Sequence, residues 1–293
     1  MGGSAITTDD PPRKLRTVAT GLAFGEAPRW HQGRLYFSDI HANRIGVLRP
    51  DGAPETVATF RGPVSGLGWM PDGRLLVVSM HDKRVLRREP DGRFLEHADL
   101  AALATGFAND MLVTADGSAY VGNFGFSLHP PGEPRAAVLA LVGADGAVSC
   151  AADDLSFPNG MALTPDGNTL IVAESRARCL TAFDRAGNGV LSRRRLWAKL
   201  PDGAFPDGIC LDSEGAVWVA SPSTCEVLRL RAGGAVLERV PTGLEAIACM
   251  LGGRDRKTLF VCTAQSRDPT FCQAHHTARI EAVEVDVAGA GWP

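Results

Sequence analysis

The chain has 293 residues, a net charge of −3 and 45% hydrophobic residues, values that argue against wholesale disorder. Its 30 basic and 33 acidic residues are interspersed, so no nucleic-acid partner is expected, and no apolar run approaches the ~18 residues of a membrane span. Glycine supplies 33 residues and proline 19. Because both residues break helices, short strands joined by turns are expected.

The first 15 residues lack the apolar core of a signal peptide, so no signal peptide is expected there. They are predicted to be a short disordered tail. A lone strand is expected next, over 16–21. The best helix candidate is short, at 99–106. His129, in a proline-rich segment, is either a cap on a channel mouth or plain loop, and His275 and His276 are expected in a loop.

From the first strand onward, one unit recurs six times. Each copy has an apolar run, a tight turn and a second apolar run, and another hairpin follows before the next copy. The turn glycines are Gly33, Gly73, Gly117, Gly167, Gly215 and Gly253. Their separations of 38 to 50 residues, with four strands per period, are typical of a β-propeller.

The predicted fold is therefore all-β: a six-bladed β-propeller with a central metal-binding channel, as a single domain over residues 16–293. Strands at 16–21 and 278–287 would pair in one blade and close the ring. An open solenoid or a pair of sandwiches is the alternative. The seven cysteines are scattered without a CxxC pair, which favours buried free thiols and a cytoplasmic location.

One position of the repeat carries a polar residue in every copy, eight residues before the turn glycine, or seven in the first copy. These residues are Glu26, Ser65, Asn109, Asn159, Asp207 and Glu245. Inner strands line a propeller's channel, so the side chains should point at a common axis. Converging carboxylates repel without a counter-charge, and oxygen donors suit Ca²⁺, Mg²⁺ or Mn²⁺. Alternatively, these residues only hydrogen-bond strand ends and channel water.

Four motifs occur in a recognisable order: GEAPRW at 25–30, FAND at 107–110, FPNG at 157–160 and FPDG at 205–208. In this order they resemble the family of gluconolactonase and senescence marker protein 30 (regucalcin). The resemblance runs from about residue 21 to the C-terminus. It implies a six-bladed propeller with a divalent metal in its channel.

The resemblance also implies residue roles. Glu26, Asn159 and Asp207 would bind the metal, and Asp207 would also be the catalytic acid and base. Asn109 would contact the metal or the substrate, and Asp110 would support the inner strand. Ca²⁺ is the expected ion, with Zn²⁺, Mn²⁺, Mg²⁺ and Fe²⁺ as alternatives.

Two departures from the family concern the substrate. Sugar-lactone members carry Arg where this chain has Phe107, and Glu where it has Ser127. Phe124 and Phe126 add apolar surface nearby. Substrate binding is therefore assigned to Asn109, Phe107, Ser127 and Phe124, and the lactone or ester should be less polar than a free sugar lactone. The alternative is that these phenylalanines pack between blades.

The predicted function is a metal-dependent lactone or ester hydrolase, in which the metal polarises the carbonyl and Asp207 supplies acid/base or direct nucleophilic catalysis. A phosphotriester hydrolase on the same site and a non-catalytic calcium- or ligand-binding propeller are alternatives. A strictosidine-synthase-like condensing enzyme would lack this set of metal ligands. The expected partner is a small-molecule lactone or ester, with no membrane, and the chain is expected to be a monomer or weak homodimer.

Overall fold

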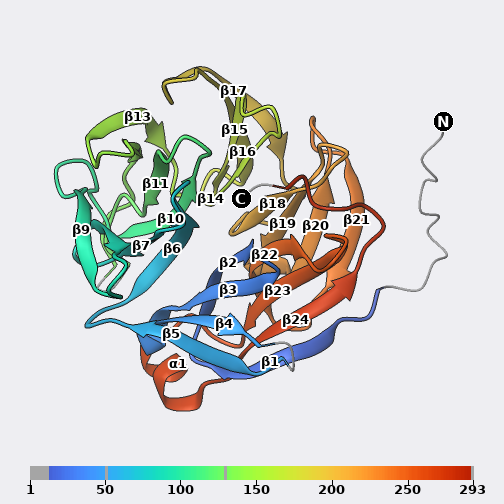
Figure 1. Cartoon of the computed structure of the whole chain (residues 1–293). Helices are drawn as coiled ribbons and strands as arrows, with labels where there is room; N and C mark the ends of the chain where they lie inside the picture. Colours follow the sequence, from blue (N-terminus) through green and yellow to red (C-terminus); the bar gives the residue numbers. More distant parts are fainter. Residues whose placement is uncertain (1–12, 50–51, 129–130, 292–293) are drawn as a thin grey trace.

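Six four-stranded sheets are arranged as blades around a central channel in the computed structural model, which describes residues 13–49, 52–128 and 131–291 (Figure 1). This confirms the predicted six-bladed propeller. The innermost strands are β2 (Gly25–His31), β6 (Val64–Trp69), β10 (Ala108–Val113), β14 (Pro158–Leu163), β18 (Ile209–Leu211) and β22 (Glu245–Gly252).

Three further strands complete each blade. The second strands are β3 (Arg34–Asp39), β7 (Leu75–Ser79), β11 (Ala119–Asn123), β15 (Thr169–Glu174), β19 (Val217–Ser221) and β23 (Thr258–Ala264). The third strands are β4 (Arg44–Leu48), β8 (Arg84–Arg88), β12 (Ala137–Val142), β16 (Cys179–Arg185), β20 (Glu226–Leu230) and β24 (Ala278–Glu284). The outer strands are β5 (Pro54–Thr59), β9 (Phe94–Asp99), β13 (Val148–Leu155), β17 (Leu191–Lys199), β21 (Val236–Pro241) and β1 (Arg16–Leu22).

Both ends of the chain contribute to the sixth blade, as predicted. The N-terminal strand β1 pairs antiparallel with β24, with Arg16 opposite Ala282 and Leu22 opposite Ala278. This pairing closes the ring and covers the exposed edge of β24. The six turn glycines also behave as predicted, because all have positive φ values, between 71° and 86°. Such values are accessible to glycine at little steric cost.

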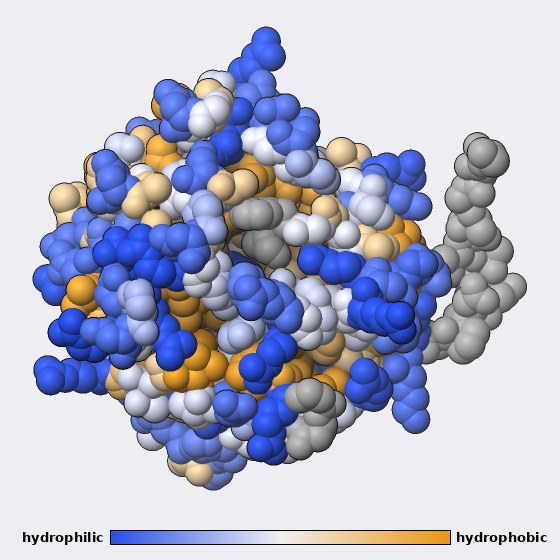
Figure 2. Space-filling model, in the orientation of Figure 1, coloured by the Kyte–Doolittle hydropathy of each residue, from blue (hydrophilic) through white to orange (hydrophobic). Residues whose placement is uncertain are grey.

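Burial falls from the channel to the rim of the propeller. Every residue of β10 and β14 is buried, whereas most of β17 is exposed. Trp218, Tyr120 and Phe37 are completely buried in the core. On the face shown in Figure 2, hydrophilic side chains cover most of the periphery, and apolar residues show as smaller areas between them. All seven cysteines are free thiols, and five of them are buried.

The helix expected at 99–106 is not formed, and this prediction was wrong. The segment makes only a single turn, in which the amides of Leu103 and Ala104 donate to the Leu100 carbonyl. Asp99 is still the last residue of strand β9, and the Leu100 amide donates to the Lys83 carbonyl at 2.8 Å, so the start of the segment belongs to the sheet. The described residues instead contain one α-helix, α1 (Pro269–His275), and two short 3-10 helices, η1 (Ile40–Ala42) and η2 (Pro222–Thr224).

Helix α1 occupies the stretch for which a loop was expected. The Asp268 side chain caps it by accepting a hydrogen bond from the Phe271 amide at 2.8 Å, and Pro269 fits the first helical turn. His275 therefore lies in the last turn of α1. His129 lies outside the described residues, as do residues 1–12 of the expected tail. Within the described part of the chain, no helix is long and apolar enough to cross a membrane.

Candidate functional site

The six repeated polar residues all lie where the innermost strands begin, at one end of the channel. Glu26, Ser65, Asn109 and Asn159 are each the second residue of their strand, and Glu245 is the first residue of β22. Asp207 lies two residues before β18, where its amide donates to the Ala220 carbonyl at 3.0 Å. The equivalent phase in every repeat therefore gives an equivalent place in the channel.

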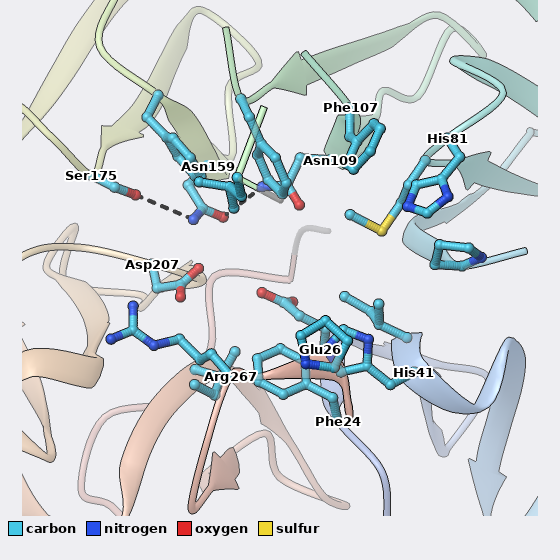
Figure 3. Close-up of a pocket in the computed structure, with 18 of the residues that line it drawn as sticks. Phe24, Glu26, His41, His81, Phe107, Asn109, Asn159, Ser175, Asp207 and Arg267 are labelled. Carbon is cyan, nitrogen blue, oxygen red and sulfur yellow. Dashed lines mark hydrogen bonds between the residues drawn. The ribbon is translucent and has the colours of Figure 1, made fainter. Parts of the chain in front are cut away.

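A chain of side-chain hydrogen bonds crosses three of these strands. Ser65 Oγ donates to Asn109 Oδ1 at 3.4 Å, and Asn109 Nδ2 donates to Asn159 Oδ1 at 3.2 Å. Asn159 Nδ2 in turn donates to Ser175 Oγ at 3.2 Å (Figure 3), and Ser175 Oγ donates to the Pro206 carbonyl at 2.7 Å. The chain thus ends on the residue before Asp207 and fixes the orientation of both amide side chains.

The carboxylates of Glu26 and Asp207 face each other across the channel (Figure 3). Burial, chiefly, raises the pKa of Glu26 well above its usual value, and the nearby charges of Asp207 and Asp110 raise it further. Burial likewise raises the pKa of Asp207 to about 7, although the charge of Arg267 and a hydrogen bond from Asn159 oppose this effect. The site therefore brings together two carboxyl groups that resist ionisation without a counter-charge.

Close backbone contact sets the depth of these residues in the channel. A Cβ atom placed on Gly160 would lie 2.5 Å from the Ile209 nitrogen and 2.7 Å from the Asp207 carbonyl oxygen. Gly160 N also donates to that carbonyl at 3.3 Å. At Gly208, an added Cβ would lie 2.4 Å from the Ala248 Cβ. The glycine of each FP[N/D]G motif thus lets neighbouring inner strands approach beside a polar residue.

A cavity of about 740 Å³ opens above this polar set. Its polar lining includes Glu26, Asn109, Asn159, Ser175 and Asp207. Its walls are largely apolar, and they include Phe24, Ile40, Met80, Phe107, Phe124, Leu128, Phe157, Phe205 and Ile247. His41, His81 and four arginines also line the cavity. The combination of apolar walls with a few convergent polar groups is typical of a small-molecule site.

Of the phenylalanines expected near the substrate, two line the cavity and one packs behind its wall. Phe107 and Phe124 line the cavity, and the Phe124 ring stacks on Phe157 with 4.6 Å between centroids. Phe126 is not a lining residue, but its ring meets Phe157 edge-on at 6.0 Å. Both alternatives therefore hold in part, because Phe107 and Phe124 form the cavity wall, whereas Phe126 packs against Phe157.

Ser127 and Glu245 do not line the cavity. The neighbouring Leu128 is a lining residue, and the Ser127 carbonyl accepts a hydrogen bond from the Gly132 amide at 2.8 Å. Glu245 forms an ion pair with Arg267 at 2.7 Å. The structure thus brings Glu26, Asn109, Asn159, Asp207, Phe107 and Phe124 together, and it leaves Ser127 outside the set.

The donor set has the composition that hard cations prefer. Among the described residues, no group of three or more His, Cys, Asp and Glu side chains could hold a metal ion. Glu26 and Asp207 instead combine with the amide oxygens of Asn159 and Asn109, so every candidate donor is oxygen. No arginine or lysine of the described residues pairs with either carboxylate. A divalent cation therefore fits this site, because its charge would replace the protons that the raised pKa values favour.

Comparison with known proteins gives the family. The model of the SMP-30/gluconolactonase/LRE-like region matches residues 24–265. The chain belongs to this family. All six repeated polar residues lie within the matched stretch.

Similar proteins include two named lactonases and a regucalcin structure. A pentonolactonase of Haloferax volcanii is 28% identical over 254 residues, which cover 85% of this chain and 84% of the relative. A 6-deoxy-6-sulfogluconolactonase of Pseudomonas putida is also 28% identical, with 82% and 83% covered. The solved structure of regucalcin from Agrobacterium tumefaciens, described as a calcium-binding protein, has the same fold, with a TM-score of 0.81, 22% identity and coverage of 96% and 97%.

Several cavity residues were missed from the sequence. Ser175 and Arg176 follow β15, and Phe157 precedes the FPNG asparagine by two residues, yet none occupies the repeated polar position. What these residues share is their place in the repeat. They lie at the end of each blade opposite the turn glycines, where the loops surround the channel mouth. Phe157 also has a positive φ of 62°, which is unusual for an aromatic residue and typical of constrained sites.

Proposed function

We propose that this family member is a metal-dependent hydrolase that opens a lactone, or an ester, less polar than a free sugar lactone. The observation that carries the proposal is the pair of raised-pKa carboxyl groups, Glu26 and Asp207, beneath a cavity with apolar walls. The names of two relatives, a pentonolactonase and a sulfogluconolactonase, support a lactone as the substrate class.

The proposed metal ligands are Glu26, Asn159 and Asp207, with Asn109 beside them. Ca²⁺ is the ion we propose first, because the donors are all oxygen and the similar regucalcin structure is described as calcium-binding. When bound, such an ion would polarise the substrate carbonyl and stabilise negative charge on its oxygen. Asn109 donates to Asn159 and thereby holds the Asn159 amide oxygen in a fixed orientation.

Asp207 is the proposed catalytic acid and base. It takes a proton from the attacking water as the water oxygen bonds to the carbonyl carbon. The ring C–O bond then breaks, and Asp207 returns the proton to the leaving alkoxide. Burial raises the pKa of Asp207 to about 7, which suits a group that both takes and returns a proton near neutral pH.

Phe107 and Phe124 are the proposed walls of the substrate site, together with Phe157. Phe107 packs on His81 with 4.1 Å between ring centroids. These rings offer no donor to sugar hydroxyls, which would lose hydrogen bonds with water on binding. An apolar ring substituent gains from the same contact.

The direct test is acid release from a panel of lactones, esters and a phosphotriester, with and without EDTA. The proposal predicts turnover of lactones or esters that EDTA abolishes and added metal restores, with apolar lactones preferred over gluconolactone. Turnover of the phosphotriester alone would make the protein a phosphotriester hydrolase instead of a lactone hydrolase. Metal binding without any turnover would instead make the chain a binding propeller, and EDTA-resistant turnover would contradict the metal-dependent account.

A further inference from the structure

The cavity carries an excess of positive charge. Four arginines line it, whereas Glu26 and Asp207 are its only lining carboxylates among the described residues, so its formal charge is +2 with both ionised. The whole chain has a net charge of −3. The positive charge is thus local to the cavity, where Arg61, Arg176 and Arg178 are exposed and can meet a ligand that enters from solvent.

Only one of the four arginines pairs with a carboxylate of the described residues. Arg267 pairs with Glu245 at 2.7 Å. Within the part of the chain that the structure describes, no carboxylate lies within 4.0 Å of Arg61, Arg176 or Arg178. A divalent cation would offset the charge of Glu26 and Asp207, so these three arginines would stay uncompensated in the metal-loaded protein.

Arg176 and Arg178 lie on one turn that is tied to the site. The turn joins β15 to β16 and begins at Ser175, whose hydroxyl is bonded to Asn159 and to the Pro206 carbonyl. The Arg176 amide donates to the Ser156 carbonyl at 3.3 Å. The carbonyl of Arg178 accepts from the Leu200 amide at 3.0 Å. The backbone that carries both guanidinium groups is therefore held in place.

The Arg176 guanidinium is also oriented. Its central carbon lies 4.7 Å from the centroid of the Phe126 ring, and Phe126 in turn packs on the lining residue Phe157. A cation held over a ring face keeps its in-plane N–H donors free. Such planar donors can bind a carboxylate, sulfonate or phosphate through two parallel hydrogen bonds.

Arg61 lines the cavity from the other side. It precedes β6, and the β5–β6 connection lies across the channel from the blade that contains β14 to β17 (Figure 1). A cavity of about 740 Å³ is much larger than a bare lactone ring requires. There is room for a substituent that extends from the ring to the arginine turn.

We infer that the substrate carries an anionic group on an apolar body, and that Arg176 and Arg178 bind this group while the reacting carbonyl lies at Glu26 and Asp207. This inference rests on the proposed function for its reacting end. The anionic group is recognised through its oxygens, so a carboxylate is a sufficient probe. Arg61 would add to the local positive charge, but we assign it no direct contact with the anionic group.

The first test compares two apolar lactones that differ only at the end of one side chain, which is a carboxylate in one and a carboxamide in the other. Wild-type protein should prefer the carboxylate in kcat/KM. The double variant Arg176→Gln/Arg178→Gln should lose about tenfold or more on the carboxylate and little on the carboxamide, because charged hydrogen bonds are lost only from the former. Added salt should weaken the wild-type preference.

Arg231→Gln is the matched control, because Arg231 is exposed, pairs with no carboxylate of the residues that the structure describes, and lies outside the cavity. It should keep the wild-type preference. Equal kcat/KM for the two lactones in wild-type protein, or an unchanged preference in the double variant, would overturn the inference.

A binding measurement separates this inference from the hydrolase proposal. Calorimetric titration of 4-phenylbutyrate and 4-phenylbutyramide into protein in EDTA removes any carboxylate–metal contact. Tighter binding of the carboxylate, lost in the double variant and kept in Arg231→Gln, supports the arginine site even if no lactone is hydrolysed. Equal binding of both probes together with normal lactone turnover would contradict the inference of an anionic group and would still agree with the hydrolase proposal.

Discussion

The guanidinium of Arg29 in β2 donates from Nη2 to Oδ1 of Asp110 in β10, 2.7 Å away. Only 5% of each side chain is exposed. The pair links the first and third blades just below the site, because Arg29 follows Glu26 by three residues and Asp110 follows Asn109. Burial is the main cause of the raised pKa of Glu26, and Asp110 raises that pKa further while Arg29 lowers it.

Breaking this pair should destabilise the fold strongly. Arg29→Met leaves the Asp110 carboxylate buried without a cation, which costs about 3–5 kcal/mol in comparable buried pairs. Urea unfolding followed by fluorescence measures the loss. Arg239→Met is the control, because the pair of Arg239 with Glu226 is more exposed and should be worth at most about 1 kcal/mol. Equal losses in the two variants would contradict the importance of burial here.

Gly160 should be intolerant of a side chain. Gly160→Ala would force its Cβ against the backbone of Asp207 and Ile209, and overpacking of this kind typically costs about 1–3 kcal/mol. Because that backbone carries Asp207, kcat should also fall. Gly187→Ala is the matched control, since nothing lies within 4 Å of a Cβ added there. Thermal unfolding and lactone turnover of both variants would be measured, and equal behaviour would refute the close-approach argument.

The sequence predicted those features that repeat. The turn glycines and the polar residue eight positions earlier recur in each blade, so periodicity alone located Glu26, Asn109, Asn159 and Asp207 at one end of the channel. Part of the cavity wall also repeats, because a phenylalanine stands two residues before the polar position in four copies, at positions 24, 107, 157 and 205, and all four line the cavity. The cavity mouth could not be predicted in this way, since Arg176 lies in a connection that differs from blade to blade.

The two candidate helical segments were also predicted incorrectly from local sequence. At 99–106, alanine and leucine favour a helix, but Asp99 ends strand β9 and the Leu100 amide is bonded to the Lys83 carbonyl, so only one turn forms. At 269–275, the Asp268–Pro269 pair is a recognisable start signal that composition alone obscured. Ser127 was placed near the substrate by resemblance, yet the chain presents Leu128 to the cavity.

Metal affinity should weaken as the pH falls through about 7. Burial, above all, raises the pKa of Asp207 to about 7, and Glu26 is also shifted upward. Each carboxyl group must lose its proton to bind a cation, so protons compete below this pH. Calorimetric titration with Ca²⁺ between about pH 5.5 and 8.5 should show affinity falling by up to about tenfold per unit on the acid side for one proton displaced. A constant affinity across this range would contradict the assignment of these ligands.

Phe107 should favour apolar substrates. Phe107→Ser removes a ring from the cavity wall, so kcat/KM for an apolar lactone should fall by about tenfold, and that for gluconolactone by less. Phe94→Ser is the control, because Phe94 packs on Phe60 away from the cavity. A parallel loss on both lactones in Phe107→Ser would mean that the ring only supports the fold.

The most direct test of the central claim is acid release from dihydrocoumarin, an apolar lactone, by wild-type protein, Asp207→Asn and Asp202→Asn. Asp202 is an exposed carboxylate near Asp207 in sequence and lies outside the cavity. The account predicts that Asp207→Asn loses about 10²- to 10⁴-fold in kcat with an unchanged circular dichroism spectrum, while Asp202→Asn keeps wild-type turnover. Wild-type turnover by Asp207→Asn would contradict it.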